Sequence, residues 1–204
     1  SNSTAEAFFS DVFDQAQSAT LSAKNSVEGG KNLASSNNFC ALITIEPFDL
    51  TTFPKDITVD FGEGCLGNDG KLRKGKIMIN ATNWFKETGS IITVGLENYS
   101  VSGFGVEGTN TITNNGLNSD NFLSYNFQVK NGKITNPENN SVTQWSSNRT
   151  IEWIKGEETI TASDDEYKIT GTQNGITAAD EEYSIEITEA IHIDMSCEWR
   201  IVAG

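Results

Sequence analysis

The sequence of 204 residues has few of the side chains that most catalytic and metal sites require. It contains a single histidine, His192, and three cysteines, Cys40, Cys65 and Cys197. A Ser-His-Asp or Cys-His site needs an imidazole, and no Gly-x-Ser-x-Gly nucleophile motif is present. No two cysteines have the C-x-x-C spacing of a zinc site or a thioredoxin-like motif. We therefore predict no catalytic residues and expect that the protein is not an enzyme.

Basic residues and long apolar runs are also scarce. Fourteen Lys and Arg stand against 28 Asp and Glu, so the net charge is -14 and the isoelectric point is about 4.4. This charge repels phosphate backbones and anionic lipid surfaces, which argues against nucleic acid as a partner. No stretch approaches the roughly 20 apolar residues of a membrane helix, and the first residues lack the basic and apolar regions of a signal peptide. The sequence predicts a soluble chain.

The N-terminal segment has helical periodicity. Ser3 and Glu6 have the spacing of a capping box, and Phe8, Val12 and Ala16 recur on one helical face. We predict a helix over residues 1–24 that docks onto the rest of the chain, because a membrane-surface helix would need flanking Lys and Arg. Residues 25–38, rich in Ser, Asn, Gly and Lys, are predicted to form a linker.

From residue 39 onward the apolar residues alternate with polar ones, as in half-buried antiparallel strands. The longest alternation runs over residues 191–201 and predicts one long strand. Tight hairpin turns are predicted at Asn-Gly and Asp-Gly pairs that begin at Asp69, Asn115, Asn131 and Asn174. Residues 39–204 are therefore predicted to form a single antiparallel β domain.

The predicted fold class is all-β, an antiparallel up-and-down meander with one N-terminal α-helix. Such a sheet must cover its apolar face. It can fold over as a sandwich, curl into a barrel or half-barrel, or receive the N-terminal helix, and the pattern does not choose among these solutions. Prolines on edge strands prevent pairing with other chains, but this chain has only three. We therefore expect closure of the sheet or charged edge residues to prevent aggregation.

Cys40 and Cys65 flank a predicted hairpin centred on PFDLTTFPKD, which would bring their strand ends together as a candidate disulfide. Strict alternation places the two cysteines on opposite faces of the sheet unless Gly62 or Gly64 makes a bulge. Cys197 is left as a free or buried thiol.

A glycine-rich segment offers oxygen ligands. The candidate calcium ligands are Asp60, Glu63, Asn68 and Asp69, in a loop that glycines allow to bend. The spacing differs from that of an EF-hand, and the alternative is a hydrogen-bonded turn with Asp60 or Glu63 paired to Arg73 or Lys74. No other cofactor is predicted.

The four tryptophans are candidate sugar-stacking residues. Trp199 follows the apolar alternation and Trp153 shares its parity with Ile151, so both are assigned to the core. Trp84 and Trp145 remain as surface candidates. A glycosidase needs only two carboxylates across a cleft, but the many acidic residues do not single out a pair.

Two segments carry a resemblance to a family: FPKDITVDFGEGCLGNDGKLRKGKI at 53–77, and NWFKETGSIITVGLENYSVSGFGVEGTNTITNNG at 83–116. They resemble uncharacterised surface lipoproteins of Bacteroidetes-type bacteria, with a similar DFG-x-GC, DG and RKG pattern at Asp60 to Cys65, Asp69-Gly70 and Arg73 to Gly75. The resemblance covers the chain from about Phe39. It implies an exported protein at the outer membrane or cell surface, held there by a lipid anchor upstream of this chain.

The sequence and this resemblance together favour a non-catalytic cell-envelope module that binds a glycan or an envelope protein. A carboxylate-dependent carbohydrate-active enzyme and a structural envelope protein are the alternatives. The membrane is expected to be a partner only through the lipid anchor.

Overall fold

The computed structural model describes residues 2–30, 40–159, 162–196 and 201–204. One helix, α1 (Asn2–Glu28), precedes all the strands. The strands are β1 (Leu42–Glu46), β2 (Lys55–Asp60), β3 (Cys65–Leu66), β4 (Leu72–Ala81), β5 (Ile91–Val101), β6 (Phe104–Leu117), β7 (Leu123–Thr135), β8 (Val142–Lys155), β9 (Glu166–Ile176), β10 (Glu182–Asp194) and β11 (Ile201–Ala203). A 3-10 turn, η1 (Ala162–Asp164), lies between β8 and β9.

All eleven strands of the described residues belong to one antiparallel sheet in the order β1-β2-β4-β5-β6-β7-β8-β9-β10-β11, with β3 paired to β4 beside this path. Consecutive strands are neighbours, so the predicted antiparallel meander with an N-terminal helix is confirmed. The sheet is not closed into a barrel, because β1 at one end and β11 at the other do not pair in the described chain. The structure therefore covers the apolar face by docking the helix.

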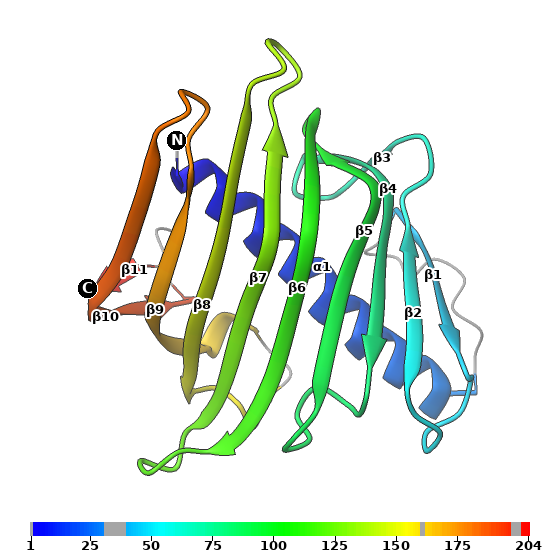
Figure 1. The fold of residues 1–204 in the computed structure, drawn as a ribbon. Coiled ribbons are helices and arrows are strands. Elements are labelled where there is room, and N and C mark those ends of the chain that lie inside the picture. Colours follow the sequence, from blue (N-terminus) through cyan, green and yellow to red (C-terminus); the bar gives the residue numbers. More distant parts are fainter. Residues whose placement is uncertain (1, 31–39, 160–161, 197–200) are drawn as a thin grey trace.

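Helix α1 crosses one face of the sheet diagonally, from the side of β8 and β9 at its N-terminus to β1 and β2 at its C-terminus (Figure 1). Val12, Ala16, Ala19 and Ala23 recur at helical spacing and are all buried against the sheet. Three of these four side chains are alanines, which let the helix backbone approach the strands closely. The helix ends at Glu28, so it continues into the segment predicted as a linker.

Three of the four predicted turn pairs lie inside long strands, and that part of the prediction is wrong. Only the pair Asp69-Gly70 forms a turn, between β3 and β4. Asn115-Gly116 and Asn131-Gly132 lie at register shifts of β6 and β7, where Gly116 and Asn131 have positive φ. These pairs therefore supply the backbone conformations of β-bulges, which bend strands without ending them.

The predicted long strand over residues 191–201 is also interrupted. β10 ends at Asp194, a turn follows at Met195 and Ser196, and β11 returns to pair with His192 and Ile193. Trp199 and Cys197, within the predicted strand, lie outside the described residues. The alternation continues through the turn in the sequence, so periodicity alone did not reveal it.

Candidate functional site

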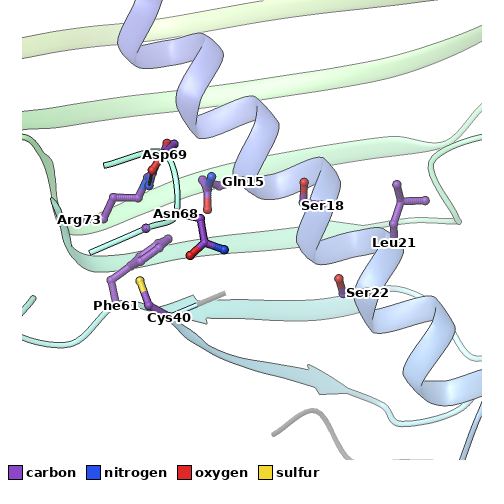
Figure 2. A pocket seen from close by; sticks show the side chains of 10 residues that line it. Gln15, Ser18, Leu21, Ser22, Cys40, Phe61, Asn68, Asp69 and Arg73 are labelled. Carbon is purple, nitrogen blue, oxygen red and sulfur yellow. Dashed lines mark hydrogen bonds and ion pairs between the residues drawn. The ribbon is translucent and has the colours of Figure 1, made fainter. Parts of the chain in front are cut away.

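A groove of about 580 Å³ lies between α1 and the segment that joins β2 to β4. This volume falls within the range typical of small-molecule sites. Figure 2 shows Gln15 beside Asn68, with Ser18 and Ser22 further along the same helix. The lining residues are Gln15, Ser18, Leu21, Ser22, Cys40, Phe61, Gly67, Asn68, Asp69 and Arg73.

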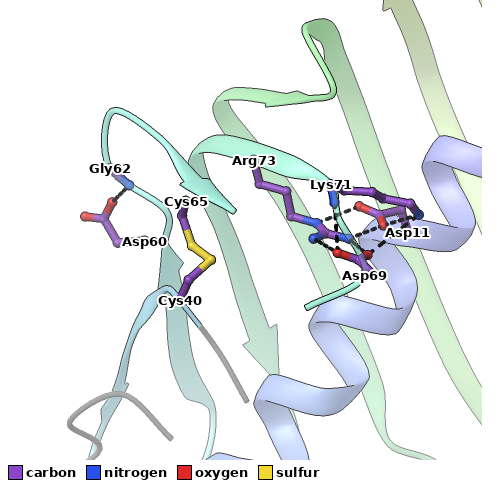
Figure 3. Close-up of a disulfide and its surroundings, with 8 residues drawn as sticks. All are labelled: Asp11, Cys40, Asp60, Gly62, Cys65, Asp69, Lys71 and Arg73. Carbon is purple, nitrogen blue, oxygen red and sulfur yellow. Dashed lines mark hydrogen bonds and ion pairs between the residues drawn. A yellow bond between two sulfur atoms is a disulfide. The ribbon is translucent and has the colours of Figure 1, made fainter. Parts of the chain in front are cut away.

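Arg73, which lines the groove, forms a buried ion pair with Asp11, and Asp69 binds the same guanidinium from the β3–β4 turn (Figure 3). Arg73 donates from Nε to Asp11 Oδ2 at 3.0 Å and from Nη1 to Asp69 Oδ1 at 3.0 Å. Lys71 Nζ donates to Asp11 Oδ1 at 2.8 Å, and the Tyr99 hydroxyl donates to Asp11 Oδ2 at 3.1 Å. The cluster thus ties the helix to the sheet.

The charges in this cluster balance. Burial would raise the pKa of Asp11, but hydrogen bonds from Arg73 and Lys71 outweigh it and hold the pKa below its usual range. Hydrogen bonding to Arg73 lowers the pKa of Asp69 to about 2. Burial and the neighbouring Asp11 carboxylate raise the pKa of Tyr99, which keeps its hydroxyl protonated. Two carboxylates therefore face one guanidinium and one ammonium at neutral pH.

The disulfide between Cys40 and Cys65 holds one wall of the groove (Figure 3). The two Cα atoms are 5.5 Å apart, within the usual range for a disulfide. Gly62 and Gly64 both have positive φ, but they lie in a turn between β2 and β3 and not in a bulge, and Cys65 keeps the buried parity of Phe61. The structure therefore contains the disulfide proposed from the sequence.

The candidate calcium ligands are divided between two places. Asp69 binds Arg73, and Asn68 lines the groove. The Asp60 carboxylate accepts a hydrogen bond from the Gly62 N–H and lies 3.7 Å from Lys76 Nζ. Within the described residues, no three His, Cys, Asp or Glu side chains are grouped to hold a metal ion. Calcium binding by Asp60, Glu63, Asn68 and Asp69 stays a prediction, and the pairing with Arg73 is made by Asp69 instead of Asp60 or Glu63.

Trp84 and Trp145 do not lie at the surface, so their prediction as stacking residues is wrong. Trp84 is 8% exposed, packs edge-on against Phe53 and donates from Nε1 to the Leu50 carbonyl. Trp145 is 3% exposed and lies against Gly132, where an added Cβ would come within 2.8 Å of its ring. Both rings are core residues, as is Trp153, which was assigned to the core.

A second polar cluster lies at the other end of the sheet. Asp165 is buried and accepts hydrogen bonds from Trp153 Nε1 at 3.2 Å and from the Tyr167 hydroxyl at 2.8 Å. Its pKa is raised, because burial outweighs these hydrogen bonds. His192 is half-buried, with Nε2 2.9 Å from Glu166 Oε2. These groups link strands and loops, and they line no part of the groove.

Sequence reasoning missed Asp11 and Tyr99, and it considered Arg73 only as a partner for Asp60 or Glu63. One signal was present: Arg73 shares its parity with Ile77 and Ile79, which places it on the buried face of β4. No sequence pattern relates a helix position to a strand 62 residues away. The contact between Asp11 and Arg73 therefore required the structure.

No protein-family model, curated protein or solved structure matches this chain. In the described residues no helix is long and apolar enough to cross a membrane.

Proposed function

We propose that the protein is a non-catalytic binding module of a bacterial cell envelope, and that the groove beside α1 holds a neutral polyhydroxyl ligand such as a short glycan. The observation that carries the proposal is the lining of the groove. Its rim presents the amides of Gln15 and Asn68 and the hydroxyls of Ser18 and Ser22. Amides and hydroxyls both donate and accept hydrogen bonds, as sugar hydroxyls require.

The balanced charge of the groove favours a neutral ligand. Arg73 and Lys71 neutralise Asp11 and Asp69, so the cluster offers no unpaired charge to an ionic ligand. The net charge of -14 on the whole chain adds a repulsive field for anions. A small glycan without acidic groups meets both conditions.

The disulfide supports an exported protein. Structural disulfides form and persist in oxidising compartments and are rare in the cytosol. The pair Cys40 and Cys65 therefore fits the location that the resemblance to surface lipoproteins implies. We propose that a lipid anchor upstream of this chain holds the module at the outer membrane or cell surface.

Binding is favoured over glycoside cleavage by the state of the two carboxyls beside the groove. A glycosidase needs one carboxylic acid whose raised pKa keeps it protonated near neutral pH. Asp11 and Asp69 have lowered pKa values because Arg73 stabilises their ionised forms. Neither carboxyl is therefore protonated at neutral pH, and neither can serve as the general acid. A carbohydrate-active enzyme would therefore need a different pair of carboxyls.

The test is a glycan array probed with the wild-type chain and with two single variants. Ser18 is an exposed groove residue, so Ser18→Trp fills the groove without disturbing the core. Asn25→Trp places the same ring on an exposed part of α1 that does not line the groove. We expect neutral oligosaccharides to bind the wild type and Asn25→Trp but not Ser18→Trp. Binding that survives in Ser18→Trp would contradict the proposal, as would an array on which no neutral glycan binds.

A further inference from the structure

Strand β10 leaves most of one edge open in the part of the chain that the structure describes. On one side β10 pairs with β9 from Glu182 to Asp194. On the other side β11 pairs only with His192 and Ile193. Figure 1 shows β10 at the end of the sheet, beyond β9. The segment 182–188 therefore presents backbone N–H and C=O groups that can pair with another strand.

The helix-facing side of this segment is apolar and only partly covered. Tyr183, Ile185 and Ile187 alternate on that side, opposite Gly175, Gln173 and Gly171 of β9. Ile185 is 39% exposed. The opposite edge of the sheet differs, because Ile43 of β1 is 1% exposed beneath α1. An added strand at β10 would extend the sheet and cover the apolar row with its own apolar residues.

The other side of the same segment is acidic. Glu182 and Glu186 are exposed there, and Glu189 is exposed just beyond them. The whole of β10 contains no Lys or Arg. A strand that paired at this edge would therefore place its outward side chains next to carboxylates.

We infer that the β10 edge binds an extended segment of a partner protein in which apolar residues alternate with Lys or Arg. A second copy of this chain is a poor occupant, because its own β10 would place Glu182 and Glu186 against like charges. A basic strand gains main-chain hydrogen bonds, apolar contacts with Ile185 and attraction to the glutamates together. This inference concerns a protein partner and does not depend on the proposed glycan groove.

The test uses two blocked, fluorescent octapeptides, one alternating Lys with Val and the other alternating Glu with Val. Fluorescence anisotropy measures the affinity of each, and hydrogen exchange followed by mass spectrometry locates the bound segment. We expect the Lys peptide to bind, to slow exchange within residues 182–188, and to bind at least tenfold more tightly than the Glu peptide.

Two variants and one control keep the result specific. The double variant Glu182→Lys with Glu186→Lys should reverse the peptide preference, and Ile185→Lys should weaken binding of the Lys peptide at least tenfold. Glu46→Lys makes the matched charge change on β1, at the other edge, and should leave binding unchanged. Equal affinity of the wild type for the two peptides would overturn the inference. So would a Glu46→Lys variant that weakens binding of the Lys peptide as much as Ile185→Lys does. A wild-type dimer in sedimentation analysis that Ile185→Lys dissociates would assign the edge to a second copy and would also overturn it.

Discussion

Arg73 is the residue that joins the three parts of the candidate site. It lies on β4, bonds Asp11 of α1 and holds Asp69 of the β3–β4 turn. The side chains of Arg73 and Asp11 are each 3% exposed, so neither ion can be satisfied by bulk water. A buried pair of this kind adds little net stability over an apolar pair, but loss of one partner leaves a buried charge unpaired.

Replacing Arg73 with Met should therefore destabilise the fold strongly. We expect the free energy of unfolding to fall by about 3–5 kcal/mol, because Asp11 would remain buried without its guanidinium. Urea denaturation followed by circular dichroism measures the change. Lys74→Met is the matched control, since Lys74 is the next residue and is exposed. A loss for Arg73→Met no larger than for Lys74→Met would show that the cluster does not hold the helix.

The same cluster should make stability depend on acid pH. The pKa of Asp69 falls from its ordinary 3.8 to about 2 in the folded chain. Because the folded value is lower, the stabilisation by Arg73 is present above pH 3.8 and is lost as the pH falls towards about 2. Asp69→Asn should show a smaller loss over this interval than the wild type. Urea midpoints at pH 6, 4 and 2.5 test this, and parallel curves for the two proteins would refute it.

At the scale of elements, apolar alternation predicted the meander and helical spacing predicted α1. Trp145 shows where the pattern failed. It lies on the same face as Trp153, but two of the three positions between them on that face are Ser147 and Arg149, and this interrupts the apolar pattern. Arg149 is accommodated on that face by donating to Gln173 Oε1. Because this contact between β8 and β9 places a charged side chain on the buried face, the sequence pattern did not indicate that Trp145 is buried.

The turn predicted at Asn131-Gly132 is a bulge, and the sequence alone could not distinguish the two. A local pair that tolerates positive φ has the same sequence signature in a tight turn and in a bulge. Strand length distinguishes the two, and it depends on neighbours distant in the sequence. The Cys40–Cys65 pairing could be proposed because a hairpin lies between the cysteines, whereas the groove needed the position of α1.

Gly132 should tolerate no side chain, because it makes room for Trp145. An added Cβ would lie 2.8 Å from the indole ring. We expect Gly132→Ala to lower the free energy of unfolding by about 1–3 kcal/mol, a typical cost of overpacking. The control is Gly105→Ala in β6, where the nearest atom to the added Cβ, on Thr135, is 3.7 Å away. Thermal or urea denaturation compares the two, and equal stability losses would mean that Trp145 is not confined by Gly132.

At the scale of the whole molecule, several of the contacts that tie the sheet to other segments gather at one end of it. The side of β1 to β4 carries the disulfide, the Arg73 cluster and the C-terminal half of α1. That side also contains Lys55, which is fully buried and donates to the carbonyls of Pro47 and Asp49. At the other end of the sheet, the described part of β11 pairs only with His192 and Ile193 of β10. We propose that a small ligand binds at the first end and that a partner strand adds at the β10 edge.

The most direct test of the proposed function is hydrogen exchange of the wild-type protein with and without a millimolar mixture of neutral oligosaccharides. The groove account predicts slower exchange in residues 15–22 of α1 and 61–73 of the facing segment, with the rest of the sheet unchanged. Unchanged exchange in both segments, or protection confined to another surface, would contradict it.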